Sequence, residues 1–222
     1  MSRRLPTTEV QALLAQMERC MIAVDDFGFV MLVDGKPQMV SHCSKDPDAR
    51  WGRARRGYGK GYKVHAIYGS SSMPLAWDVE PLNVAETPVA VRLLPILGRG
   101  GGYLVADRGY DSNQLHDAAM EAGYQLVAEK LRPGKGLGHC RHSPGRIRCF
   151  ALLEQEFGRA LIRFRNQVER RFAWLGNHAG GLEPLPNWAR RIHRVREWVQ
   201  AKLLIHAMYM LLNLHPPPLA GE

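Results

Sequence analysis

The sequence is poor in cysteine and contains no CxxC pair. Only four of its 222 residues are cysteines: Cys20, Cys43, Cys140 and Cys149. So few cysteines exclude a disulfide-stapled scaffold and favour a reducing compartment. The spacing of Cys140 and Cys149 from His139 and His142 matches none of the usual paired zinc-ligand patterns. We therefore expect a cytoplasmic protein without a structural zinc site.

Long apolar runs are also missing. The N-terminal stretch MSRRLPTTEVQALLAQ carries two arginines but no apolar core of a secretory signal. The longest apolar stretch, residues 198–214, falls short of the roughly 20 residues of a membrane helix and contains Gln200, Lys202 and His206. We expect a buried C-terminal helix over about 188–214 and no membrane partner.

Acidic residues are outnumbered by basic ones. Lys and Arg total 30 against 21 Asp and Glu, which leaves a formal net charge of +9. Hydrophobic residues make up 45% of the chain, as in folded globular domains, so wholesale disorder is excluded. The positive surplus favours a polyanionic partner, either nucleic acid or an anionic membrane face.

Basic residues gather in three stretches, 50–63, 130–148 and 159–171. The first, RWGRARRGYGKGYK, has six basic residues, four glycines and no acid, and three aromatic residues lie among them. We expect a flexible basic connection here, because glycines let the backbone approach DNA and basic side chains release counterions on contact. A solvated charged surface is the alternative. The residues expected to follow the DNA backbone are Arg55, Arg56, Lys60 and Lys63.

Apolar periodicity predicts strands followed by β-α-β alternation. Such an order is typical of one mixed sheet covered by helices. The Asp34-Gly35 pair between FVMLV and PQMV indicates a hairpin turn. The other expected elements are a helix over 8–22, strands over 62–69 and 74–81, a helix over 86–97, a strand YLVA, a helix capped by Ser112, a strand YQLVAEK, a loop over 131–148 and a helix over 150–176.

Three acidic residues stand out by their placement. Asp34 follows the first strand, Asp107 follows the YLVA strand, and Glu169 lies in an arginine-rich helix. Ligand sites in α/β sheets lie beyond the carboxyl ends of strands, so the two aspartates are expected to converge. Carboxylates clustered in this way repel one another unless a divalent cation such as Mg²⁺ or Mn²⁺ lies between them. The structural alternative is that aspartate favours turns. Asp111 is either a helix-start residue or an outer partner of this site.

Five sequence blocks strengthen this hypothesis. They resemble the catalytic domain of DDE transposases of bacterial insertion sequences, over about 30–212 and in the family's order. The resemblance implies an α/β, ribonuclease-H-like fold with a mixed β-sheet flanked by helices. It also implies that Asp34, Asp107 and Glu169 bind two Mg²⁺ ions, which Mn²⁺ can replace, and drive DNA cleavage and strand transfer. The blocks are LVDGKPQMV, SKDPDARWGRARRGYGKGYKVHAIYG, WDVEPLNVAETPVAVRLLP, YLVADRGYDSNQL and RNQVERRFAWLGNHAGGLEPLP.

The resemblance also sets expectations for partners and organisation. The partner is double-stranded DNA, both transposon ends and target, and joint processing of two ends favours a homodimer in the nucleoid of a bacterial cytoplasm. We expect a helical extension over 1–24, the catalytic domain over 25–214 and a tail over 215–222. About 25 residues precede the first strand, which suggests a catalytic fragment or a minimal subtype. Three arginines are expected to steady phosphates near the third carboxylate: Arg165, Arg170 and Arg171.

Two positions depart from the family pattern. Many relatives carry a tyrosine where this chain has Ile162, and a lysine where it has Gly176. Because that lysine is thought to hold DNA near the metal site, two other functions stay open. One is a catalytically inactive DNA-binding remnant, and the other is a hydrolytic nuclease on the same fold.

Overall fold

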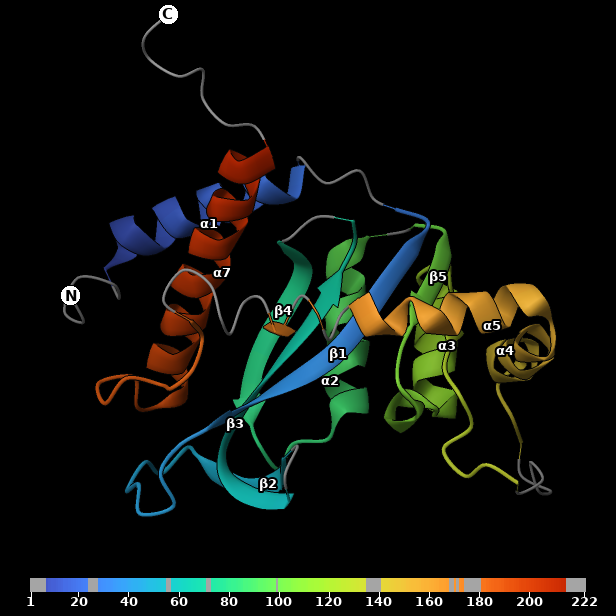
Figure 1. The fold of residues 1–222 in the computed structure, drawn as a ribbon, viewed down its shortest axis with the longest axis horizontal. Coiled ribbons are helices and arrows are strands. Elements are labelled where there is room, and N and C mark those ends of the chain that lie inside the picture. Colours follow the sequence, from blue (N-terminus) through green and yellow to red (C-terminus); the bar gives the residue numbers. More distant parts are fainter. Residues whose placement is uncertain are drawn as a thin grey trace, which may run out of the picture.

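A computed structural model of the chain describes residues 7–23, 28–54, 57–70, 73–98, 100–134, 141–167, 170, 172–173 and 181–214. These residues form a six-stranded mixed sheet with helices on both faces (Figure 1). The strands are β1 (Val30–Met39), β2 (Arg50–Ala54), β3 (Gly57–Tyr68), β4 (Pro74–Pro81), β5 (Gly102–Val105) and β6 (Tyr124–Val127). The helices are α1 (Thr8–Ala23), α2 (Glu86–Leu93), α3 (Asn113–Glu121), α4 (Pro144–Glu154), α5 (Glu156–Arg163) and α7 (Ile192–Leu214), with 3-10 turns η1 (Leu94–Leu97) and η2 (Arg108–Tyr110).

The sheet combines antiparallel and parallel pairing. Its order is β2-β3-β1-β5-β6, and β4 pairs with the second half of β3. β1 runs antiparallel to β3 and parallel to β5, and β5 runs parallel to β6. An antiparallel meander continued by parallel strands, with helices on both faces, is the expected ribonuclease-H-like arrangement, so the predicted fold class is confirmed.

Two hydrophobic cores cover the two faces of this sheet, because successive side chains of a strand point to opposite sides. In β1, Leu32 belongs to the core under α5 and α7, whereas Met31 and Val33 belong to the core under α2 and α3. In β5, Val105 belongs to the core under α5 and α7, and Leu104 belongs to the core under α2 and α3. The alternation fixes which face each site residue occupies.

The structure corrects one predicted turn and one predicted loop. The Asp34-Gly35 pair makes no hairpin, since β1 continues through it and pairs there with Ala66 and His65 of β3. Continuous pairing with β3 keeps this segment extended and outweighs the turn preference of the dipeptide. The predicted loop over 131–148 ends earlier, because α4 begins at Pro144, a residue well suited to the first turn of a helix.

The prediction that residues 50–63 form a flexible connection is also wrong. Residues 50–54 form β2 and residues 57–63 belong to β3. Glycines make this pairing possible: a Cβ on Gly52 would stand 2.4 Å from the carbonyl oxygen of Leu82, and one on Gly61 would stand 2.2 Å from that of Gln38. The glycines therefore pack one side of the β2–β3 ribbon tightly onto neighbouring backbone.

Helix α7 lies across α1 on one side of the sheet (Figure 1). Glu18 of α1 accepts hydrogen bonds from Trp77 of β4 and from Gln200 of α7, the latter at 3.0 Å. At the start of α7, the amide of Ile192 donates to Asp48 at 3.0 Å. Across the described part of the chain, no helix combines the length and apolarity that a membrane span requires.

Candidate functional site

Asp34 and Asp107 each follow the parallel pairing of β1 with β5 by two residues. The last paired residues of β1 and β5 are Leu32 and Val105, and each aspartate follows two positions later. Asp34 lies within β1, not at its end as predicted, because β1 continues along β3 after β5 has ended. Both aspartates are half-buried. The sheet therefore brings the two predicted carboxylates to the same edge.

Backbone amides orient both carboxylates. Asp34 Oδ1 accepts a hydrogen bond from the amide of Gly35 at 2.7 Å, and Asp107 Oδ1 accepts one from the amide of Gly109 at 2.7 Å. The second bond caps the 3-10 turn η2. Each carboxylate is thus held by the backbone through one oxygen, and oxygen-donor groups of this kind suit Mg²⁺ or Mn²⁺.

The third predicted carboxylate, Glu169, lies outside the described residues. A described neighbour in the sequence, Phe172, packs edge-to-face against Tyr68 with ring centroids 5.6 Å apart. The amine of Lys36, two positions after Asp34 on the same strand face, donates to the carbonyl oxygen of Phe172 at 3.3 Å. Residue 172 is therefore anchored on β1 close to Asp34.

Sequence reasoning missed a second charged pair at this edge. Glu86, the first residue of α2, forms an ion pair with Lys63 of β3 at 2.7 Å. Lys63 was expected to follow DNA further out, but it is only 8% exposed and its aliphatic chain lies against Gly35. Acidic residues are common in the first turn of a helix, because the helix dipole is positive there. The position of Glu86 in the sequence is therefore only a weak indication of a functional site.

Tyr110 belongs to the core under α2 and α3. It is fully buried, and among the described residues its hydroxyl finds no hydrogen-bond partner. Burial raises the pKa of Tyr110 well above its usual value, and the negative charges of Glu86, Asp34 and Asp107 raise this pKa further. The phenol therefore stays protonated, next to a region of concentrated negative charge.

Asp111 belongs to the structural frame and does not start a helix. Arg146 donates to both of its carboxylate oxygens, at 2.7 and 2.8 Å, and the amide of Leu131 donates at 3.0 Å. Burial raises the pKa of Asp111, but hydrogen bonds from His116, Arg146 and Leu131 outweigh burial and lower the pKa below its ordinary value. Asp111 thus ties the segment after β6 to α4.

The predicted DNA-contacting residues divide among three places. Lys60 is half-buried on the β2–β3 ribbon and donates to the carbonyl oxygen of Ser44 at 2.5 Å. Arg165 is half-buried after α5, and Arg170 is exposed. Ile162, at one of the two departures from the family pattern, packs against the core under α5 and α7. Four positions lie outside the described residues: Arg55, Arg56, Arg171 and Gly176.

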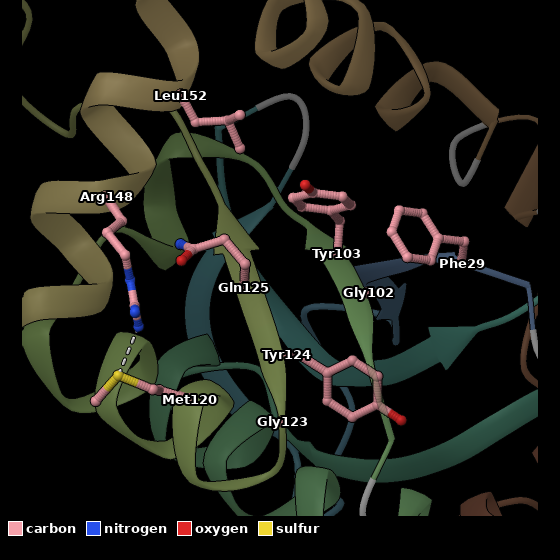
Figure 2. A pocket seen from close by; sticks show the side chains of 9 residues that line it. All are labelled: Phe29, Gly102, Tyr103, Met120, Gly123, Tyr124, Gln125, Arg148 and Leu152. Carbon is pink, nitrogen blue, oxygen red and sulfur yellow. Dashed lines mark hydrogen bonds between the residues drawn. The ribbon is translucent and has the colours of Figure 1, made fainter.

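Two cavities lie near the parallel strands. One, of about 420 Å³, includes Arg108, the residue after Asp107, and its charged lining comprises three basic and two acidic residues: Arg108, Lys130, Arg159, Glu129 and Glu154. The other, of about 460 Å³, is lined by Tyr103, Tyr124 and Arg148 and borders the first residue of β5 (Figure 2). Neither cavity is lined by Asp34 or Asp107 themselves.

Comparisons with known proteins identify the family of the chain. The family model described as the transposase DDE domain matches residues 30–214. A protein of Burkholderia cepacia named as a transposase for the insertion sequence element IS402 is 31% identical over 144 residues, which cover 57% of this chain and 67% of the relative. The matched range includes both aspartates of the sheet edge and all six strands.

Proposed function

The chain belongs to the transposase DDE domain family, and we propose that it catalyses metal-dependent DNA cleavage and strand transfer. The observation that supports the proposal is the register of β1 and β5, whose last pair, Leu32 and Val105, lies two residues before each aspartate. Glu169 is proposed as the third carboxylate, and the anchoring of Phe172 on β1 supports its approach to Asp34. The proposed catalytic domain spans residues 25–214.

The residues at the sheet edge fit a pair of divalent cations such as Mg²⁺. Asp34 and Asp107 would hold the ions through their carboxylate oxygens, and Glu169 would complete the set. Bound cations supply an activated water and neutralise charge on the phosphodiester. The proposed donor set consists only of carboxylate oxygens.

The proposed reaction is a pair of phosphoryl transfers. Water attacks the phosphodiester at the element end, its oxygen bonds to phosphorus, and the 3′ oxygen leaves with a proton. The freed 3′-hydroxyl then bonds to a phosphorus of target DNA while a second 3′ oxygen leaves. Asp34 and Asp107 position the reacting groups, and nearby arginines neutralise charge, which is the main task of a protein in such transfers.

The β2–β3 ribbon supports a DNA-binding surface next to this site. Cross-strand partners share a face, so Trp51, Arg53, Tyr58 and Lys60 all lie on the ribbon side opposite the packed glycines. Trp51 is 48% exposed and Tyr58 is 73% exposed, and their rings lie 11° from parallel. Flat aromatic rings interleaved with cations suit DNA, because bases stack on rings and phosphates attract cations.

Further cations line the cavity that includes Arg108, the residue after Asp107. Arg108 follows β5 and Arg159 belongs to α5, far apart in the sequence, yet both line this cavity. We propose that these cations and Arg165, Arg170 and Arg171 receive the DNA backbone on the side of the aspartate pair. Two DNA ends processed together would require two copies of the chain, so the proposed assembly on DNA is a homodimer.

One experiment separates this function from its alternatives. A plasmid carrying the reading frame with its natural flanking DNA is incubated with the protein and Mg²⁺, and the products are sequenced. A transposase cuts at terminal inverted repeats and joins the cut ends to target DNA. Cutting without joining would indicate a hydrolytic nuclease, and DNA binding without cutting would indicate an inactive remnant.

A further inference from the structure

Two cations converge on Ser44, a residue of the segment between β1 and β2. The amine of Lys60 donates to the carbonyl oxygen of Ser44 at 2.5 Å, and the guanidinium of Arg190 donates to the hydroxyl oxygen of the same residue at 2.8 Å. Lys60 belongs to β3, whereas Arg190 lies two positions before α7. The fold thus brings two basic side chains from distant parts of the chain to one serine, and the proposed reaction gives Arg190 and Ser44 no role.

Both cations are held by neutral oxygens and not by carboxylates. The other hydrogen bond of Arg190 goes to the carbonyl oxygen of Asn187 at 3.0 Å. Among the residues that the structure describes, neither Lys60 nor Arg190 forms an ion pair. Arg196 of α7, by contrast, pairs with Asp78 at 2.9 Å. Like charges that are held close together repel unless an opposite charge compensates them, so this pair favours an anion.

The acidic residues of the same segment bind elsewhere. Asp46 is only 1% exposed, and it accepts hydrogen bonds from the hydroxyl of Tyr62 at 2.7 Å and from the amide of Arg191 at 3.2 Å. Asp48 accepts from the amide of Ile192 at 3.0 Å and forms an ion pair with Arg191 at 3.7 Å. The two acids therefore fix the segment on β3 and on the start of α7, which holds the converging cations in place.

The hydroxyl of Ser44 adds a hydrogen-bond donor between the two cations. Its oxygen accepts from Arg190 and, at 3.3 Å, from the amide of Asp46. A serine hydroxyl also has one proton to donate, and in the described part of the chain no group accepts it. One hydroxyl and two cations form a set of donors only, and such a set is complementary to the oxygens of a phosphate group.

The position of this set relates it to the aspartate pair. Successive residues of a strand alternate between the two faces, so Lys60 shares a face of β3 with Ala66, which pairs with Asp34. Six residues of strand separate them by about 20 Å, and B-DNA rises about 3.4 Å per base pair, so the separation corresponds to about six base pairs. Lys60 is also the cross-strand partner of the exposed Trp51. The set therefore lies beside the ribbon face and away from the reacting groups.

We propose that Lys60, Arg190 and the hydroxyl of Ser44 together bind one phosphate of the DNA backbone, about six base pairs from the phosphodiester that is cut. The proposal rests on the proposed function, which supplies both the DNA and the position of the cut. It adds a phosphate site that orients the duplex, built on the segment that Asp46 anchors, and it takes no part in the chemical step.

The first test measures binding of a fluorescein-labelled duplex that carries the element end, by fluorescence anisotropy without Mg²⁺. Arg190→Gln keeps a donor for Ser44 but removes the charge, and it should weaken binding about tenfold, as one lost charged hydrogen bond does. Arg190→Lys keeps the charge and should recover part of the affinity. Arg148→Gln is the matched control, because Arg148 is also exposed and also donates to a neutral atom, Met120 Sδ, at 2.8 Å. It should bind as the wild type does.

The second test asks whether both cations bind the same phosphate. The double variant Lys60→Met/Arg190→Gln should lower the slope of log affinity against log salt by about one, whereas two separate phosphate contacts would lower it by about two. A neutral methylphosphonate is then placed at one linkage of the duplex at a time. At about six base pairs from the cut it should weaken binding by the wild type, and it should have little further effect on Arg190→Gln.

Each result has a distinct meaning. Wild-type affinity in Arg190→Gln, or an equal loss in Arg148→Gln, overturns the phosphate site, and so does a slope that falls by about two in the double variant. Should Arg190→Gln fail to fold in thermal unfolding, Ser44→Ala removes the hydroxyl and keeps both charges, and wild-type affinity in that variant overturns the inference equally. A duplex that shows the expected binding losses but is not cut with Mg²⁺ overturns the proposed reaction and leaves the phosphate site intact.

Discussion

Asp34 and Asp107 each lie two residues beyond Leu32 and Val105, the last pair of the parallel strands β1 and β5. β5 ends just before Asp107, whereas β1 continues along β3 past Asp34. The end of β5 opens the sheet on one side of β1. Asp34 therefore faces an edge that another segment or a ligand can approach while its own backbone stays paired with β3.

Removing one aspartate should separate cleavage from binding. Asp107→Asn keeps the size of the side chain but removes the charge that would hold a cation. We expect Mg²⁺-dependent cleavage to fall at least 100-fold, while the DNA affinity measured by fluorescence anisotropy stays within about twofold, because phosphate contacts dominate affinity. Asp117→Asn on α3 is the control and should cleave normally. Full cleavage by Asp107→Asn would remove Asp107 from the site.

The exposed ribbon face should contribute to DNA binding. Trp51→Ala should weaken binding of single-stranded DNA by about 1–3 kcal/mol, the usual value of one stacked base. Arg53→Ala should lower the slope of log affinity against log salt by about one, as expected for one lost phosphate contact. Arg194→Ala, an exposed arginine on α7, is the control. Equal effects of Arg53→Ala and Arg194→Ala would show that only net charge matters.

Glycine 52 should be required for stability, because a side chain there has no room. A Cβ would stand 2.4 Å from the carbonyl oxygen of Leu82, which belongs to the backbone and cannot rotate away. Gly52→Ala should therefore lower the free energy of unfolding by about 2–3 kcal/mol in urea denaturation, within the range for overpacking. At Gly101 a Cβ meets nothing within 4 Å, so Gly101→Ala should change stability by less than about 0.5 kcal/mol.

Stability should fall as the pH is lowered below 6.5. Burial, and to a smaller extent the charges of Lys63 and Arg92, lower the pKa of His65 to about 3. Between pH 6.5 and 3 the unfolded chain therefore binds a proton that the folded chain does not. The resulting loss is at most about 1.4 kcal/mol per pH unit. Urea denaturation at several pH values should show a smaller slope for His65→Leu, while His42→Leu at an exposed position should keep the wild-type slope.

Much of the fold could be predicted from local patterns. The alternation of apolar residues located β3, β4 and β5, and the Ser112 side chain does cap α3, accepting from the amide of Leu115 at 3.3 Å. Local signals failed where long-range pairing decides the structure. Asp34-Gly35 reads as a turn, but β3 holds it extended. Gly52 and Gly61 read as flexible, although both pack against neighbouring backbone.

The site was predictable only in part, for a similar reason. Asp34 and Asp107 follow apolar strands, so their convergence could be expected before their register was known. Glu86 and Lys63 lie on different elements, and only the tertiary fold brings them to 2.7 Å. Tyr110 reads as an ordinary core residue, and only the fold shows that its hydroxyl has no hydrogen-bond partner within the described part of the chain. The role of Glu169 as the third carboxylate stays a prediction, as does the division of the chain into a helical extension, a catalytic domain and a tail.

The central claim, that Asp34 and Asp107 hold a divalent cation, can be tested by metal-directed cleavage of the polypeptide. Fe²⁺ replaces Mg²⁺, and ascorbate with peroxide then generates hydroxyl radicals that cut the backbone next to the bound ion. We predict cuts close to residues 34 and 107, suppressed by excess Mg²⁺ and lost in both Asp34→Asn and Asp107→Asn. Cuts confined to other parts of the chain, or unchanged in the two variants, would contradict the account.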